Sequence, residues 1–441
     1  MKTKRTIHAI CLFLILGALA GTPAVQAQAP SGEGPTPAAP TSDPWIANQR
    51  VNDINGGDQE DPAIAIGGDG VQYVLWTNGT NEVRLSYIAP DGDWNDSEWV
   101  ADSGQASDIA ADGDGNVYIL WKTDTSLDFA TRTVSGTWTE ESIGPSTSVS
   151  ALGADDAGNV QAAWLANGPS VVARHRAAGG GWGGAATVWT AGSDTAIWDM
   201  DLAVTAEGDA YLVWLTFEGA VGAPVYGRVY GAYRPAGGAW GGATQIDEVP
   251  LHTGLGFGWL AADAAGSHAH VAWSMYDFLL DGGSVYQPVQ YARGSGAGWS
   301  TPETIPGTPL PEDHLRTNLA VGAGGQGEAQ VCWSVAQSWE PIRCALRGQS
   351  GSWGAVTIAS DGVAGHRFEP HLATRGATTH LVWTDNRRGD YDVYYTRLPT
   401  PHLRTSSTYY LPADVFVPGH DQLVYTVPDQ DGNGNCLNEA V

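Results

Sequence analysis

The side chains best suited to chemistry stand between residues 367 and 390, where acids and arginines alternate. Glu369 follows Arg367 by two positions, and Asp385 and Asp390 flank Arg387. Hydrolysis of a glycosidic bond needs two carboxyl groups that face each other, one of which donates a proton. Arginine offers a planar pair of N–H donors that fits a carboxylate. These residue types fit a carbohydrate site with Asp385, Asp390 and Glu369 as candidate catalytic acids. A surface turn at residues 385–392, whose acids pair with its own arginines, is the alternative.

Aromatic rings and further arginines occupy the long connections in the second half of the chain. Rings beside acids and arginines suit a carbohydrate or a peptide as ligand. Two more acids, Glu218 and Asp277, lie in the same kind of connection and widen the choice of a catalytic pair. The candidate ligand-binding residues are Arg316, Arg343, Arg367, Arg387, Tyr276, Tyr286 and Trp339.

Metal-binding and cysteine patterns are sparse. Asp429, Asp431 and Asn433 alternate as the oxygen ligands of a calcium loop do, and Glu439 stands one place before the twelfth position of such a loop. Asp112, Asp114 and Asn116 also alternate, but they match the tight turns of the other repeats, so a plain turn explains them. Phosphate-loop and dinucleotide fingerprints are absent from the sequence, so calcium is the only cofactor that we consider.

Two cysteines follow one another closely in the sixth repeat. Cys332 stands beside a strand-ending tryptophan, and Cys344 falls on the next expected strand. Outside the cytoplasm a cross-strand disulfide is one reading, and two buried thiols are the other.

These residues stand on a unit that recurs along most of the chain: a short apolar strand, an Asp/Gly turn, and a second apolar strand that ends in tryptophan. Each unit continues with a third strand, and the first six also with a fourth. Repeats of several strands each predict a propeller rather than a helical solenoid. The seven copies run Ile64–Trp76, Ile109–Trp121, Leu152–Trp164, Leu202–Trp214, Leu260–Trp273, Leu319–Trp333 and Leu372–Trp383.

The seventh unit lacks its fourth strand, because Pro399 and Pro401 follow the third strand directly. Residues 45–51 resemble the outer strand of residues 299–305 in pattern. We therefore expect an all-β, seven-bladed β-propeller of four-stranded blades over residues 45–398, with its ring closed by the N-terminal strand. Closure removes a sheet edge that would otherwise invite aggregation.

The segments outside the repeats predict export. Residues 1–27 have the basic start, apolar core and small-residue exit of a secretory signal peptide, and their apolar run is too short to span a bilayer comfortably. Residues 28–44 form a Pro/Ala-rich linker, and residues 399–441 form an extension or a truncated module. A secreted, periplasmic or cell-surface location follows.

The chain is strongly acidic. Its formal charge is -27, and removal of Lys2, Lys4 and Arg5 with the leader, which holds no acid, gives -27 - 3 = -30. Such a surface repels nucleic acid and anionic membranes, so we expect a glycan or an extracellular protein as partner.

The segments His366–Pro370 and Trp383–Tyr395 resemble the sialidase-like, BNR-repeat propeller superfamily. The resemblance implies that Arg367 grips a substrate carboxylate and that Asp390 or Asp385 serves as acid/base. The Asp-box of that family is incomplete here, since Gly136-Thr137-Trp138 keeps only its end.

The repeats are thus clearer than the catalytic motifs. We predict a secreted, non-catalytic propeller that binds a glycan or protein through its loop-rich face. That face carries the long connections of blades four to seven, both between the second and third strands and between blades. The alternatives are a sialidase-like glycoside hydrolase and a structural cell-surface repeat protein.

Overall fold

A computed structural model describes residues 45–398 apart from 91, 167–169, 220–224, 252–255, 279–283, 287, 309–316, 336–339 and 377. Every regular element in this part is a β-strand, and the strands form seven antiparallel sheets. Within the described residues no helix is long and apolar enough to cross a membrane.

Each sheet is one blade, and four strands run outward in chain order in most blades. Blade 1 holds β2 (Gln59–Ile66), β3 (Gln72–Asn78), β4 (Val83–Ile88) and β5 (Glu98–Ala101); blade 2 holds β6 (Gln105–Ala111), β7 (Val117–Lys122), β8 (Ser126–Arg132) and β9 (Trp138–Pro145); blade 3 holds β10 (Ser150–Ala154), β11 (Val160–Ala166), β12 (Ser170–Arg176) and β13 (Ala186–Thr190); blade 4 holds β14 (Thr195–Val204), β15 (Ala210–Glu218), β16 (Val225–Arg234) and β17 (Thr244–Leu251).

The last three blades vary this plan. Blade 5 splits its outer strand in two and adds a short strand beside its second strand, and blade 7 takes its outer strand from the N-terminal end. Blade 5 holds β18 (Gly256–Ala265), β19 (His268–Phe278), β20 (Ser284–Tyr286), β21 (Gln290–Ser295), β22 (Gly298–Trp299) and β23 (Glu303–Thr304); blade 6 holds β24 (Thr317–Ala323), β25 (Ala329–Val335), β26 (Arg343–Arg347) and β27 (Thr357–Ile358); blade 7 holds β28 (Arg367–Arg375), β29 (Thr378–Asp385), β30 (Asp392–Leu398) and β1 (Gln49–Arg50).

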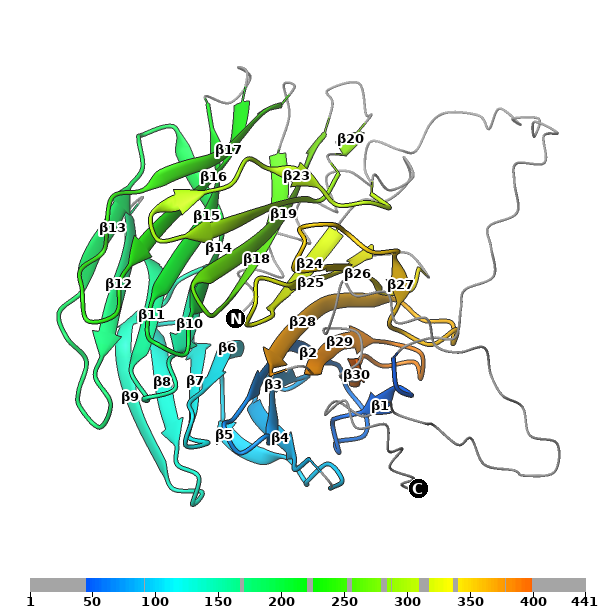
Figure 1. The fold of residues 1–441 in the computed structure, drawn as a ribbon. Coiled ribbons are helices and arrows are strands. Elements are labelled where there is room, and N and C mark those ends of the chain that lie inside the picture. Colours follow the sequence, from blue (N-terminus) through cyan, green and yellow to red (C-terminus); the bar gives the residue numbers. More distant parts are fainter. Residues whose placement is uncertain are drawn as a thin grey trace, which may run out of the picture. The chain divides into compact units, whose positions relative to one another are not determined.

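The innermost strands of neighbouring blades contact one another all the way round, so the seven blades form a closed ring. Figure 1 shows these strands, β2, β6, β10, β14, β18, β24 and β28, gathered around a common centre. The prediction of a seven-bladed propeller is confirmed.

The N-terminal strand closes the ring as predicted. In β1, Gln49 and Arg50 pair with Tyr395 and Tyr394 of β30. Trp45 and Val51, on either side of β1, are 6% and 2% exposed, so the closing segment is anchored by apolar burial as well as by hydrogen bonds.

The tryptophan that ends each second strand explains the repeat. Five of the seven, Trp76, Trp214, Trp273, Trp333 and Trp383, are among the largest fully buried side chains. Each packs into an apolar cluster shared by its own blade and the preceding one, and such a cluster fills every boundary between blades. Burial of these rings holds the blades together, because aromatic side chains bury more apolar area than any others.

The turns between first and second strands touch from blade to blade. The Gly68 N–H donates to the Asp112 carbonyl over 2.9 Å. A Cβ on Gly68 would lie 1.9 Å from the carbonyl oxygen of Gly113, so only glycine fits there. In blade 6 a disulfide joins Cys332 of β25 to Cys344 of β26, its register partner.

Candidate functional site

The inner strands of all seven blades enclose a central cavity of about 1760 Å³. Each inner strand begins at the connection from the preceding blade and ends at the tight turn to its second strand. The cavity therefore has two ends, which we call the mouth, on the face of the inter-blade connections, and the turn end.

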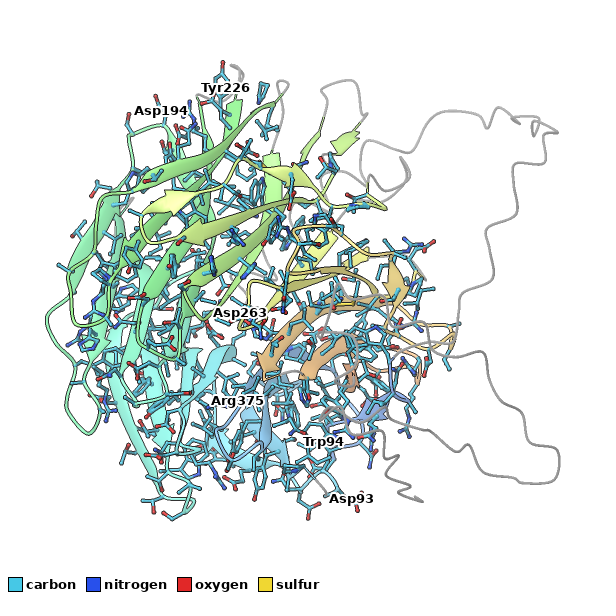
Figure 2. The ribbon with its side chains drawn as sticks, in the orientation of Figure 1. Asp93, Trp94, Asp194, Tyr226, Asp263 and Arg375 are labelled. Atoms are coloured by element: carbon cyan, nitrogen blue, oxygen red, sulfur yellow. A yellow bond between two sulfur atoms is a disulfide. The ribbon has the colours of Figure 1, made fainter. Side chains whose placement is uncertain are left out.

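An ion pair crosses the cavity at the turn end. Arg375 Nη2 of blade 7 lies 2.8 Å from Asp156 Oδ1, which belongs to the turn between β10 and β11 of blade 3. These blades are not neighbours, so the pair spans the ring rather than a blade boundary. Figure 2 shows Arg375 and Asp263 near the centre of the ring, whereas Asp93, Asp194 and Tyr226 lie at its periphery.

Side chains that accept hydrogen bonds across blade boundaries stabilise the cavity wall. An innermost strand has no inner neighbour, so its inward N–H groups need other acceptors. Carboxylates and one histidine of the preceding blade supply several of these acceptors. The Leu152 N–H donates to Asp108 over 2.7 Å, Leu260 to Asp199 over 3.0 Å, Ala262 to Asp201 over 2.7 Å, Ala323 to Asp263 over 2.9 Å, Asp61 to Glu369 over 3.1 Å, and Ile64 to His371 Nδ1 over 3.3 Å.

The surroundings of these groups oppose charge. Burial raises the pKa of Asp108 well above its usual value and raises the pKa of Asp201 and of Asp263 to about 7. Burial, with the nearby charge of Asp61 as the next cause, raises the pKa of Glu369 to about 8. These four carboxyl groups therefore favour their protonated form more than exposed acids do.

Two of these residues meet at the mouth in an unusual backbone conformation. Asp61 of blade 1 has φ 55° and Glu369 of blade 7 has φ 54°. This left-handed region is unfavourable for residues other than glycine, and such strain clusters at functional sites. Glu369 Oε2 also accepts from Thr384 Oγ1 over 3.2 Å, and Asp61 Oδ2 accepts from Gln105 Nε2 over 2.7 Å. The mouth is thus held in a defined arrangement by blades 7, 1 and 2.

Two aromatic rings accompany these polar groups. Phe368 and Trp259, on the inner strands of blades 7 and 5, are half-buried and line the same cavity. Phe368 is held edge-on against Tyr391, with ring centroids 5.0 Å apart and planes at 82°. Half-exposed rings beside hydrogen-bonding groups are typical of ligand pockets.

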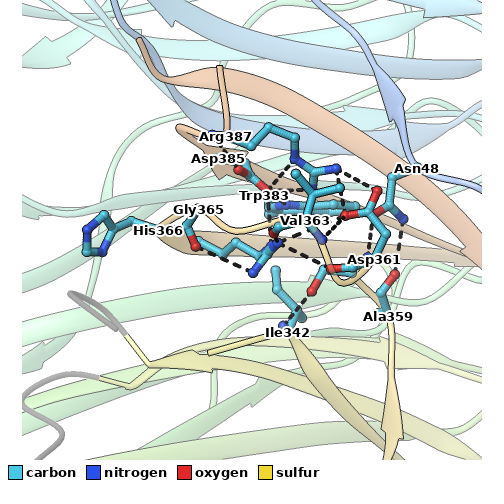
Figure 3. A network of polar contacts seen from close by, with 12 residues as sticks. Asn48, Ile342, Ala359, Asp361, Val363, Gly365, His366, Trp383, Asp385 and Arg387 are labelled. Atoms are coloured by element: carbon cyan, nitrogen blue, oxygen red, sulfur yellow. Dashed lines mark hydrogen bonds and ion pairs between the residues drawn. The ribbon is translucent and has the colours of Figure 1, made fainter. Parts of the chain in front are cut away.

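Arg367, Arg387 and Asp385 form a closed network away from the cavity (Figure 3). The Asp385 side chain is 0% exposed and the Arg367 side chain 2%. Asp385 Oδ2 lies 3.1 Å from Arg367 Nε and 2.5 Å from Arg387 Nη2, and it also accepts from Trp383 Nε1 over 3.2 Å. Arg387 Nη1 contacts both oxygens of Asp361, at 2.7 and 2.6 Å. These side chains bind one another, so we leave them out of the site.

The other described candidates also have partners within the chain. Asp390 is exposed, and its Oδ2 accepts from the Gly57 N–H over 3.1 Å, which ties blade 7 to blade 1. Arg343 lies 2.6 Å from Glu340. Glu369 is the one predicted catalytic acid that the structure places at the mouth.

Several predicted residues cannot be placed with their side chains. Tyr276 and Tyr286 are register partners on β19 and β20, but only their backbone is described. Arg316, Trp339, Asp429, Asp431 and Asn433 lie outside the described residues, as do many of the long connections of blades 4 to 6. Among the residues that are described, no three His, Cys, Asp or Glu side chains gather as a metal site would require. The calcium site remains a prediction.

Asp61 and Gln105 were not among the site residues predicted from the sequence. A signal for Asp61 was present, since Asp61-Pro62 and Glu369-Pro370 repeat an acid–proline pair at the start of two inner strands. Nothing local marks Gln105, because its role depends on the neighbouring blade.

Comparison with known proteins supports the fold. No family model and no curated protein matches the chain. Among solved structures, a lectin from Burkholderia pseudomallei is 14% identical, with 80% of this chain and 97% of the lectin covered and a TM-score of 0.52. The polysaccharide lyase Uly1 is 10% identical, with 80% and 93% covered and a TM-score of 0.52. The likeness is one of fold. The sialidase-like resemblance remains a prediction.

Proposed function

We propose that this protein is an exported, non-catalytic propeller that binds a neutral glycan at the mouth of its central cavity. The observation that carries the proposal is the joint presence at the mouth of a held aromatic ring, Phe368, and the hydrogen-bonding groups of Asp61, Gln105 and Glu369. Rings can cover the apolar face of a sugar while amide and carboxyl groups bond its hydroxyls. A lectin and a polysaccharide lyase among the proteins of similar fold are consistent with this proposal.

The charge of the cavity favours a neutral ligand over an anionic one. Its described lining has two cationic residues, Lys122 and Arg375, of which Arg375 is paired with Asp156. The acids of the lining are more numerous and would repel a carboxylate-bearing sugar even with some of them protonated. They are Glu60, Asp61, Asp108, Asp124, Asp156, Asp199, Asp201, Asp263 and Glu369.

The arginines that would grip an acidic sugar are engaged elsewhere. Arg367 and Arg387 share Asp385, and Arg343 contacts Glu340. Recruiting any of these arginines to a ligand would break an existing ion pair, and two of the pairs are buried. The proposed ligand therefore differs from the sialic-acid type that the sequence resemblance implies.

Glycoside hydrolysis is the second candidate, and one observation favours it. Burial raises the pKa of Glu369 to about 8, so its carboxyl group would be mostly protonated at pH 7, as a general acid must be. Asp61 is adjacent and would be the second carboxylate of the pair.

The test begins with the secreted form, residues 28–441, on an array of neutral and acidic glycans. The strongest neutral glycan is then titrated calorimetrically into wild type, Gln105→Ala and Phe368→Ala. We expect each substitution to weaken binding at least about fivefold, because a lost hydrogen bond or ring contact is worth about 1 kcal/mol or more. Asp390→Asn, an exposed change outside the mouth, should bind as wild type does.

Two outcomes would contradict the proposal: no saturable binding across the array, or a preference for sialylated or uronic-acid glycans. Hydrolysis is tested separately by incubating the bound glycan with the protein and analysing the products by chromatography. If products form and Glu369→Gln abolishes them while binding persists, the second candidate replaces the first.

A further inference from the structure

A salt bridge between neighbouring blades recurs at one position of the repeat. The arginine lies near the end of the third strand of its blade. Its register partner on the second strand stands two positions after the turn glycine. Its guanidinium group contacts a glutamate on the outer strand of the preceding blade. The three pairs are Arg132–Glu98 at 2.7 Å, Arg176–Glu141 at 3.9 Å and Arg347–Glu303 at 2.6 Å.

Blade 4 carries the same arginine without the glutamate. Arg234 pairs in register with Ala210, two positions after the turn glycine Gly208. The outer strand of blade 3 presents Ala186, opposite Ala173, at the place of the glutamates. Ala186 corresponds to Glu98 and Glu141 because all three stand opposite the equivalent third-strand residue of their own blade. Glu98 stands opposite Leu85, and Glu141 stands opposite Phe129.

Arg234 is nevertheless buried. The residue is 7% exposed, and it makes no side-chain hydrogen bond and no ion pair within 4 Å to any residue that the structure describes. Burial lowers the pKa of Arg234, although the charge of Asp155 acts in the opposite direction. Asp155 does not replace the missing glutamate, because no ion pair within 4 Å joins it to Arg234; its two oxygens accept from the backbone N–H and the side-chain amide of Asn159, over 2.8 and 2.7 Å. A buried arginine without a contacting acid is costly, so an anion from outside would be stabilised beside it.

A small cavity of about 140 Å³ lies at this position between blades 3 and 4. Arg234, His175, Gln161 and Asn159 line it. Two acids line it as well: the oxygens of Asp155 are bonded to Asn159, and Glu207 is exposed, so solvent screens its charge. Gln161 is 2% exposed, and its Oε1 has no hydrogen-bond partner among the described residues. A glutamine amide presents either its oxygen or its NH₂ after a 180° rotation, so Gln161 can donate into the cavity.

His175 stands where blade 1 has Tyr87. Each of them pairs in register with the second-strand residue that stands three positions after the turn glycine of its blade. Beside blade 1, the guanidinium of Arg132 lies over the Tyr87 ring, 5.0 Å from its centroid. His175 and Arg234 line the same cavity, and burial, followed by the charge of Arg234, lowers the pKa of His175.

We propose that the cavity between blades 3 and 4 is a binding site for a small carboxylate, which takes the place at Arg234 that Glu98 takes at Arg132. Arg234 supplies the positive charge and a planar pair of donors, and Gln161 and His175 supply further hydrogen-bonding groups. The volume admits a group of a few heavy atoms, such as acetate, rather than a sugar. This site does not depend on glycan binding at the mouth.

The test uses acetate as the probe and the full secreted chain. Thermal unfolding is recorded at pH 7 in increasing sodium acetate, with sodium chloride added to keep the ionic strength constant. We expect the Tm of wild type to rise with acetate, on the order of 3 °C near saturation, because a ligand that binds only the folded state stabilises it.

Three variants decide the origin of the effect. Ala186→Glu supplies the missing carboxylate from within the chain at an exposed position, so it should raise the Tm without acetate and abolish the response to acetate. Arg234→Gln should abolish the response as well. Arg132→Gln breaks the equivalent internal salt bridge and should keep the full response. No response in wild type, or an equal response in all four proteins, would overturn the proposal.

Discussion

Substitution of Asp385 should destabilise the propeller strongly without touching a ligand site. Its carboxylate is fully buried and serves both Arg367 and Arg387, whose side chains are 2% and 7% exposed. It also accepts from the Arg387 backbone N–H over 2.9 Å. Removing one partner of a buried ion pair typically costs about 3–5 kcal/mol, because the remaining charge loses its counter-ion in a place that water does not reach.

The size of the effect should stay within that range. Arg387 keeps its contacts with Asp361, and Arg367 keeps the Asp361 carbonyl at 3.2 Å, so the two guanidinium groups are not left wholly unbonded. We therefore expect Asp385→Asn and Asp385→Ala to lower the free energy of unfolding by about 3–5 kcal/mol. Asp390→Asn, which affects one exposed hydrogen bond, should cost less than about 1 kcal/mol.

The assay is urea unfolding at pH 7, followed by tryptophan fluorescence and circular dichroism. A loss below about 1 kcal/mol for both Asp385 variants would refute the reasoning that this carboxylate is a structural counter-ion. Wild-type stability together with the loss of glycan turnover would instead restore the catalytic role that the sequence suggested for Asp385.

Three further outcomes follow from the structure. Burial raises the pKa of Asp263 to about 7 and that of Glu369 to about 8, above the ordinary values of 3.8 and 4.5. The stability that these two protonated carboxyl groups contribute is therefore fully present below about pH 4 and is lost as pH rises through 7 and 8. The decline of Tm between pH 5 and 8 should accordingly be shallower in Asp263→Asn than in wild type. Reduction of the Cys332–Cys344 disulfide, whose cysteines are 12 positions apart, should lower the free energy of unfolding by about 2–3 kcal/mol, measured by urea unfolding with and without reductant, and an unchanged midpoint would contradict this. Trp45→Ala should cost about 3–5 kcal/mol in the same assay, because the ring anchors the closing strand, and a loss below about 1 kcal/mol would show that closure does not depend on it.

The sequence by itself determined the fold. The seven apolar strand pairs, each with a turn glycine and a terminal tryptophan, are local patterns that do not depend on the rest of the chain. Pro399 and Pro401 indicate that the seventh blade has no fourth strand after its third. The pairing of Gln49 with Tyr395 confirms that the N-terminal segment supplies this strand. Glu369 was also recognised as a candidate acid from its sequence setting.

Only the tertiary structure decided which polar groups are available to a ligand. Asp385 and Glu369 are both acids near an arginine in the sequence, yet Asp385 is buried beside Arg367 within blade 7 and Glu369 lines the cavity. Glu369 acquires its partner Asp61 from a position 308 residues away. Arg234 differs from Arg132 only through what the neighbouring blade presents. Contacts across blade boundaries determine the charge state, the burial and the partners of these side chains. A local sequence pattern does not show which residues of the neighbouring blade make those contacts.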